Sequence, residues 1–125
     1  MLADTEGNRF CVVDAGHGGR DPGAHANGVR EKDVTLQISR RLADVIDAAP
    51  GFRAVLVRDS DRFVEFDDRL EVARNARADL FISVHADSVG DPRVRGATVY
   101  SIEDDRAGFL RFTGVGPPDD DPRRL

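Results

Sequence analysis

The feature that most constrains the fold of this chain is the alternation of short apolar runs with stretches of helical period. Three such runs, rich in β-branched residues, lie at residues 10–13, 54–57 and 80–84. Runs of this length and composition predict strands that are buried on both faces. The order strand, helix, strand, helix, strand predicts right-handed βαβ crossovers. We therefore expect an α/β fold, with a mostly parallel twisted sheet flanked by helices.

The stretch after the first apolar run carries apolar residues at spacings of three and four, which predict an amphipathic helix. The expected inward stripe is Val34, Ile38, Leu42, Val45, Ile46 and Ala49. Glu31 and Asp33 lie at the start of this helix, where carboxylates suit the positive helix end. The pair Pro50-Gly51 ends it. A second helix is predicted across about residues 66–77, and residues 97–102 alternate well enough for a fourth strand.

Length and composition bound the class of protein. The 125 residues are enough for one small domain. Apolar residues make up 40% and charged residues 33%, which is typical of a soluble globular chain. The net charge of −5 argues against a nucleic-acid binder. No apolar stretch approaches the roughly 20 residues of a membrane span, so we expect none. The first residues have no basic start followed by an apolar run, so we expect no signal peptide there.

The chain changes character near residue 103. We expect an N-terminal extension at residues 1–8, a folded domain at residues 9–102, and an irregular tail at residues 103–125. The tail is acidic and rich in proline and glycine, which are turn formers.

Two histidines are expected at one edge of the predicted sheet. His17 follows the first strand and His85 ends the third, and ligand sites of parallel sheets lie beyond the carboxyl ends of the strands. Glu31 begins the helix that leaves the first strand's loop, at the same edge. Two imidazoles and one carboxylate match a catalytic zinc site with a fourth position open to water. Each residue alone has an ordinary explanation, as a loop histidine or a helix-start carboxylate, but their convergence favours a metal site.

Other polar residues lie close to this expected site. Asp14 and Asp87 flank the two histidines and could accept hydrogen bonds from the imidazoles, although strand-end turns also use such carboxylates. Arg58 and Arg69 could bind a substrate carboxylate, although arginines more often form surface ion pairs.

Three further residues are given ordinary roles. Asp21 precedes Pro22 and is expected to be a turn residue. His25 is expected in an exposed loop, and Cys11 is expected to be an inert residue of the core.

Four sequence blocks resemble the motifs of a known family. Residues 12–24, which read VVDAGHGGRDPGA, resemble the first motif of the zinc-dependent N-acetylmuramoyl-L-alanine amidases of the AmiC type, a bacterial cell-wall family. Three more blocks follow in the family's order: residues 31–34, residues 58–63 with Arg69 and Asn75, and residues 81–87. The segment 96–100 resembles the strand that comes next in the family. The resemblance covers roughly residues 10–102.

The resemblance implies a hydrolase that cleaves the amide between N-acetylmuramic acid and L-alanine in peptidoglycan. It implies Zn²⁺ as cofactor, with His17, Glu31 and His85 as the metal ligands. It also implies a role in cell-wall turnover or daughter-cell separation, in the periplasm or outside the cell. Peptidoglycan is the implied partner, and the need for an activator protein stays open.

The chain departs from the family's pattern after residue 102. The family's later part supplies a glutamate that acts as general base, and no residue here matches it, so the catalytic base is unknown. The only glutamate after Glu71 is Glu103, in a different context. We therefore expect a truncated amidase fold, a fragment produced by a frameshift or a premature end. The alternative function is a non-catalytic homologue that binds zinc and peptidoglycan.

A third interpretation is a phosphate- or nucleotide-binding domain that uses the glycine loop at residues 16–19. Glycine loops beside helix starts do bind anions. However, the loop is not G-x-G-x-x-G and no Gly-Lys-Ser/Thr follows it. The acidic residues at the start of the helix would also repel a phosphate.

Overall fold

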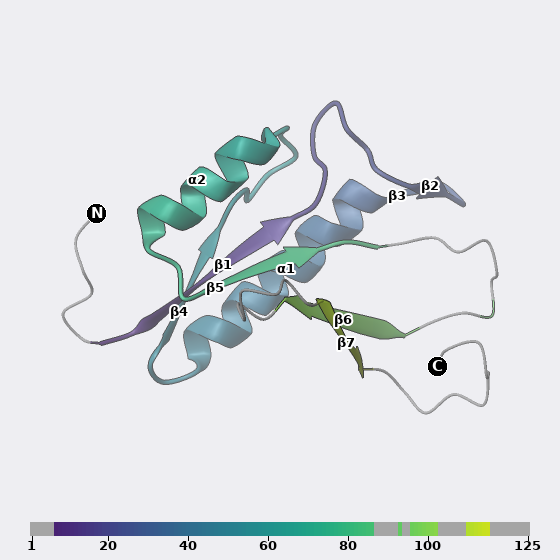
Figure 1. Ribbon diagram of the computed structural model, residues 1–125. Coiled ribbons are helices and arrows are strands. Elements are labelled where there is room, and N and C mark those ends of the chain that lie inside the picture. The colour runs from purple at the N-terminus through teal and green to yellow at the C-terminus, as the bar shows by residue number, and fades with distance from the viewer. Residues whose placement is uncertain (1–6, 87–92, 94–95, 103–109, 116–125) are drawn as a thin grey trace. The chain divides into compact units, whose positions relative to one another are not determined.

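The computed structural model describes residues 7–86, 93, 96–102 and 110–115, and the chain divides into two compact units, residues 1–87 and 88–125. The first unit is built on a three-stranded parallel sheet in the order β4–β1–β5 (Figure 1). Its strands are β1 (Arg9–Ala15), β4 (Phe52–Leu56) and β5 (Leu80–Val84). The register pairs Val12 with Val55 on one side and with Phe81 on the other. The predicted α/β class and parallel sheet are confirmed.

Two helices flank this sheet on opposite faces (Figure 1). The helix α1 (Glu31–Ala48) connects β1 to β4, and α2 (Phe66–Ala76) leads from β4 to β5. The first connection steps from the central strand to one edge, and the second steps back across β1 to the other edge. Since right-handed crossovers in opposite directions place their helices on opposite faces, the strand order accounts for the layers.

The buried face of α1 differs from the predicted apolar stripe. Ile38 and Val45, both expected inward, are 45% and 67% exposed. The helix packs against β1 and β4 through a neighbouring face. The buried residues of α1 are Glu31, Lys32, Thr35, Leu36, Ser39 and Ala43. The small side chains of Thr35, Ser39 and Ala43 allow a close approach to the sheet. The prediction is wrong for Ile38 and Val45, while the rest of the predicted stripe is half-buried: Val34, Leu42, Ile46 and Ala49.

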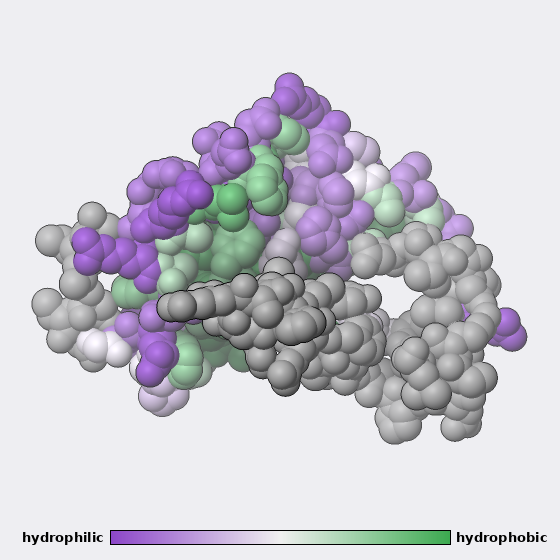
Figure 2. All heavy atoms as spheres, viewed as in Figure 1, coloured by the Kyte–Doolittle hydropathy of each residue, from purple (hydrophilic) through white to green (hydrophobic). Residues whose placement is uncertain are grey.

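The apolar core lies under α2. Val12 of β1 packs with Val57, Val64 and Ala76. Partly buried residues surround them: Val55, Val72, Ala73, Ala78 and Phe81. Figure 2 shows hydrophilic residues on the outer side of α2 and hydrophobic ones gathered between this helix and the strands. Among the described residues, no helix is long and apolar enough to cross a membrane.

A short hairpin that the sequence analysis did not predict precedes α1. Its strands β2 (His25–Ala26) and β3 (Val29–Arg30) have two residues each, too few to show a period. Asn27 and Gly28 join them with φ of 53° and 76°, the positive values that a tight hairpin turn requires. His25 is exposed, as expected.

The second unit is a two-stranded antiparallel sheet of β6 (Ala97–Ile102) and β7 (Leu110–Val115). β6 was predicted, but β7 lies inside the segment that was expected to be irregular, so that expectation is wrong for residues 110–115. Leu110 and Phe112 alternate with polar residues there, a period that the surrounding proline and acidic residues obscure. The two units meet after residue 87. Residues 103–109 and 116–125 lie outside the described residues.

Candidate metal centre

The carboxyl end of β1 leads directly into the site. Its continuation through Gly16 places His17 at a φ of 67°, in the left-handed region that few non-glycine residues adopt. The backbone of Gly18 then pairs with that of Asp21 in an isolated antiparallel bridge. The loop therefore turns back on itself immediately after His17 and holds this imidazole at the edge of the sheet.

The first residue of α1 supplies the carboxylate. Glu31 is only 7% exposed. Its Oε1 accepts a hydrogen bond from the backbone N–H of Ala24 at 2.9 Å, and its Oε2 accepts one from the N–H of Ala86 at 3.0 Å. The N–H of Glu31 donates to the carbonyl of Ala24 at 2.8 Å. Both oxygens are thus held by backbone groups that come from two separate parts of the chain.

The two histidines meet this carboxylate from different strands. Nε2 of His17 lies 3.0 Å from Oε2 of Glu31, and Nδ1 of His85 lies 3.2 Å from the same oxygen. The two rings are perpendicular, with their centroids 5.2 Å apart. One potential donor atom from each of the three residues lies within 4.8 Å of the others. The structure therefore brings together the three residues that topology predicted at this edge.

The electrostatics of Glu31 favour its charged form. Burial by itself raises the pKa of Glu31, but the N–H groups of Ala24 and Ala86 and the neighbouring His17 and His85 outweigh it and hold that pKa below its ordinary value. A buried carboxylate needs a compensating positive charge. One anionic oxygen ligand and two imidazole nitrogens make a donor set that zinc prefers, with room for a fourth ligand. The residues present therefore fit a zinc ion.

The carboxylate that contacts Nδ1 of His17 is neither Asp14 nor Asp87, the two that were predicted to accept hydrogen bonds from the imidazoles. Oδ2 of Asp21 lies 2.8 Å from Nδ1 of His17. Asp14 instead forms a buried ion pair with Arg69, at 2.7 Å, and Asp87 lies outside the described residues. The available signal was the spacing: Asp21 follows His17 by four residues, across two glycines that let the loop fold back.

Arg58 and Arg69 are buried, and the structure does not place them for contact with a substrate. Arg58 is 1% exposed and donates to the carbonyls of Ala15, Gly16, Lys32 and Ser60 and to Oγ1 of Thr35. Arg69 is 7% exposed and donates to Asp14 and to the carbonyls of Ala15, His17 and Val64. Both guanidinium groups join backbone segments around the site. The predicted role of the two arginines, contact with a substrate carboxylate, is therefore wrong.

Two glycines lie against the predicted ligands. A Cβ at Gly16 would lie 2.5 Å from Cε1 of His85. A Cβ at Gly23 would lie 2.6 Å from Cδ2 of His17 and 2.7 Å from Oε1 of Glu31. These distances are too short for any other side chain, so the glycines of the first motif let the backbone pack directly on the ligands.

A buried lysine ties the glycine loop to the segment after β4. Nζ of Lys32 donates to the carbonyl of Gly19 and to Oδ2 of Asp61, both at 2.9 Å. Oδ1 of Asp61 accepts from the N–H of Gly19 at 2.7 Å. Lys32 follows Glu31 directly, so this network also holds the start of α1.

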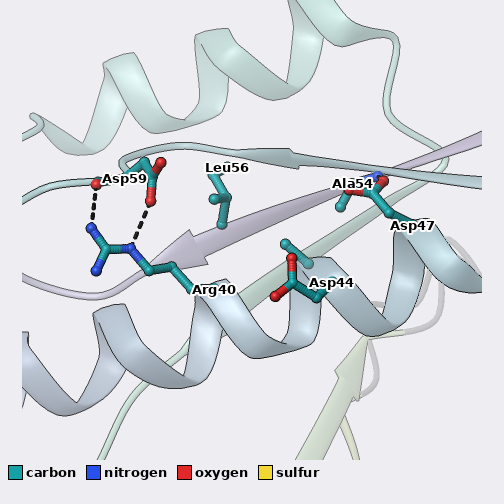
Figure 3. Close-up of a pocket in the computed structure, with 7 residues that line it drawn as sticks. Arg40, Asp44, Asp47, Ala54, Leu56 and Asp59 are labelled. Carbon is teal, nitrogen blue, oxygen red and sulfur yellow. Dashed lines mark hydrogen bonds and ion pairs between the residues drawn. The ribbon is translucent and has the colours of Figure 1, made fainter.

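A separate pocket lies between α1 and β4 (Figure 3). Its lining residues are Arg40, Ala43, Asp44, Asp47, Ala54, Leu56 and Asp59, none of which belongs to the metal cluster. Arg40 bonds both the side chain and the carbonyl of Asp59, and Asp47 accepts from the N–H of Ala54. These side chains join α1 to the outer edge of the sheet.

A family model described as N-acetylmuramoyl-L-alanine amidase matches residues 11–110, a range that contains all three predicted ligands. The chain is 45% identical over 98 residues to the probable N-acetylmuramoyl-L-alanine amidase AmiB of Haemophilus influenzae, covering 77% of this chain and 23% of that protein. It is 41% identical over 97 residues to the amidase AmiA of Escherichia coli, covering 77% of this chain and 33% of that protein.

Solved amidase structures agree with this match. The amidase AmiC2 of Nostoc punctiforme superposes with a TM-score of 0.62 at 45% identity, covering 66% of this chain and 46% of that one. The catalytic domain of CwlV, an amidase from Bacillus (Paenibacillus) polymyxa var. colistinus, superposes with a TM-score of 0.65 at 34% identity, covering 70% of this chain and 50% of that one. The chain thus spans half or less of the length of these proteins.

Proposed function

The chain belongs to the N-acetylmuramoyl-L-alanine amidase family, and on that premise we propose that it takes part in zinc-dependent hydrolysis of the amide between N-acetylmuramic acid and L-alanine in peptidoglycan. The named relatives are amidases of this type. The proposed role is cell-wall turnover or daughter-cell separation in the bacterial cell envelope.

The observation that carries this proposal is the convergence of His17, Glu31 and His85 within the family-matched segment. When bound, zinc lowers the pKa of a water ligand to about 7 and polarises a carbonyl oxygen. The protein's part is to present two imidazole nitrogens and one charged carboxylate in a preset arrangement. The N–H groups of Ala24 and Ala86 keep the Glu31 oxygens in place for this purpose.

Amide hydrolysis needs a proton acceptor. A carboxylate can serve as that acceptor only if it is free to take a proton. Asp14 does not fit, because its side chain is buried and its Oδ1 is already bonded to Nη1 of Arg69, at 2.7 Å. Two other carboxylates, Asp87, which follows His85 by two residues, and Glu103, the only glutamate after Glu71, lie outside the described residues. They are the first two to replace in an activity assay.

The test is release of stem peptide from a purified muropeptide, measured with zinc supplied and then with zinc chelated. We expect zinc-dependent release that is abolished by His17→Ala, Glu31→Ala or His85→Ala, each of which should also lower the zinc content. His25→Ala is the matched control, because His25 is exposed on β2 and lies outside the cluster. Folded, zinc-loaded protein that releases no peptide would instead support the non-catalytic, zinc- and peptidoglycan-binding alternative.

A further inference from the structure

Each ring nitrogen of His17 faces a carboxylate. Nε2 lies 3.0 Å from Oε2 of Glu31, on the side of the proposed metal. Nδ1 lies 2.8 Å from Oδ2 of Asp21, on the opposite side of the ring. A neutral imidazole carries one proton, and the nitrogen that binds a metal must be the one without it. His17 can therefore present Nε2 to a metal only if its proton resides on Nδ1.

Asp21 is itself held in place by the loop that carries it. Its second oxygen, Oδ1, accepts a hydrogen bond from the N–H of Gly23 at 3.1 Å. Its backbone N–H and carbonyl exchange hydrogen bonds with Gly18, at 3.0 and 2.8 Å. The carboxylate is thus anchored at both its backbone and its side chain, and Oδ2 is left directed at His17.

We propose that Asp21 is a positioning residue, which keeps the proton of His17 on Nδ1 and so leaves Nε2 free to bind the metal. A charged carboxylate only accepts hydrogen bonds, and Glu31 faces Nε2 as Asp21 faces Nδ1. When a metal occupies the Nε2 side, Asp21 is the acceptor that keeps the remaining proton on Nδ1. Carboxylates behind metal-binding histidines act in this way and strengthen the bond to the metal. This role rests on the proposed zinc site, but it concerns a residue that does not contact the metal.

The sharpest variant is Asp21→Asn, which preserves size and shape. The amide oxygen of the new side chain is needed to accept the N–H of Gly23, so the amide NH₂ is directed at Nδ1 of His17. A donor at that position favours a proton on Nε2, which blocks metal binding there. Replacing one oxygen by an NH₂ group therefore reverses the preferred tautomer without removing packing.

Asp33→Asn is the matched control. It removes the same charge from a side chain of nearly the same exposure, 41% against 42% for Asp21. Asp33 lies two residues from Glu31 and pairs with Arg30 at 3.1 Å. A general effect of negative charge near the site would appear in both variants, whereas control of the tautomer belongs to Asp21 alone.

Two measurements test the proposal. The first is zinc affinity, from competition with a chromophoric chelator. We expect about a 10–100-fold loss for Asp21→Asn and no change for Asp33→Asn. The second is ¹⁵N NMR of the His17 ring in the metal-free protein, assigned with His17→Ala and recorded at a pH where the ring is neutral. We expect a larger share of the tautomer protonated at Nδ1 in the wild type than in Asp21→Asn.

The outcomes separate this proposal from the proposed function. Wild-type protein that binds zinc through His17, with Asp21→Asn equal to it in affinity and tautomer, would overturn the role of Asp21 and leave the zinc site standing. Wild-type protein that does not bind zinc would overturn both.

Discussion

Nη2 of Arg69 donates a hydrogen bond to the backbone carbonyl of His17, at 2.8 Å. The same guanidinium pairs with Asp14 at the end of β1 through Nη1, at 2.7 Å. A residue of α2 therefore supports the backbone of a proposed metal ligand whose φ of 67° is unfavourable by itself. The strained backbone of His17 is therefore stabilised by a charged side chain of α2, which lies on the other face of the sheet from α1.

Replacing Arg69 is expected to cost much stability. Arg69→Met leaves the buried carboxylate of Asp14 without its partner, and breaking such a pair costs about 3–5 kcal/mol. Urea denaturation gives the free energy of unfolding. Arg74→Met is the control on the same helix, because Arg74 pairs with Glu71 at the exposed surface and should lose less than about 1 kcal/mol. Equal losses in the two variants would contradict the buried support that we assign to Arg69.

Replacing Gly23 by alanine is expected to disturb the ligands themselves. Gly23 and Gly28 both have positive φ, 67° and 76°, so alanine at either position costs about 1–2 kcal/mol of backbone strain. Only at Gly23 does the added Cβ meet His17 and Glu31, whereas at Gly28 it meets no described atom within 4 Å. Gly23→Ala should therefore bind zinc more weakly and lose more stability than Gly28→Ala. Similar zinc affinities would show that the site tolerates the added methyl group.

Two buried hydroxyl groups on α1 are expected to behave differently. Thr35 donates from Oγ1 to the carbonyl of Gly16 at 2.7 Å, so Thr35→Val should lose about 0.5–1.5 kcal/mol. Oγ of Ser39 is buried with no hydrogen-bond partner in the part of the chain that the structure describes. Because Ser39→Ala removes a buried polar group, it should leave the free energy of unfolding unchanged or raise it. Thermal denaturation of the two variants would check the difference, and a larger loss for Ser39→Ala would refute it.

Stability is expected to fall in acid through Asp61. The Lys32 ammonium and the Gly19 N–H hold the pKa of Asp61 below its ordinary value. The unfolded chain therefore takes up a proton at this carboxyl at a higher pH than the native protein does. Its contribution is present above the unfolded pKa of about 4 and is lost as pH falls through the lower native pKa. Melting temperatures below pH 4 should fall less steeply in Asp61→Asn; an identical slope in both proteins would argue against this contribution.

The orientation of α1 shows where sequence patterning reaches its limit. Val34, Ile38 and Val45 form an apolar stripe with a clear helical period, and that period correctly predicts a helix. The face that packs on β1 and β4 is instead the neighbouring one, with Thr35, Ser39 and Ala43. A period identifies a helix but does not say which stripe the sheet will cover, because close packing selects small side chains as well as apolar ones.

The supporting residues of the site show the same limit. Asp14 and Asp21 both lie within four residues of His17 in the sequence. Asp14 lies on the strand itself and pairs with Arg69. Asp21 contacts the imidazole because the loop between them contains residues with positive φ. Spacing along the chain does not determine side-chain direction where the backbone leaves the regular strand geometry.

The sequence by itself determined the order of the elements, the parallel sheet and the convergence of His17, Glu31 and His85. It could do so because apolar period selects strands and helices, and right-handed crossovers bring parallel strand ends to one edge. Only the tertiary structure decided which carboxylate contacts His17, that Arg58 and Arg69 are buried, and which face of α1 meets the sheet. Those outcomes depend on which buried polar groups form hydrogen bonds between elements far apart in the chain. The apolar period of a single segment does not determine these partners.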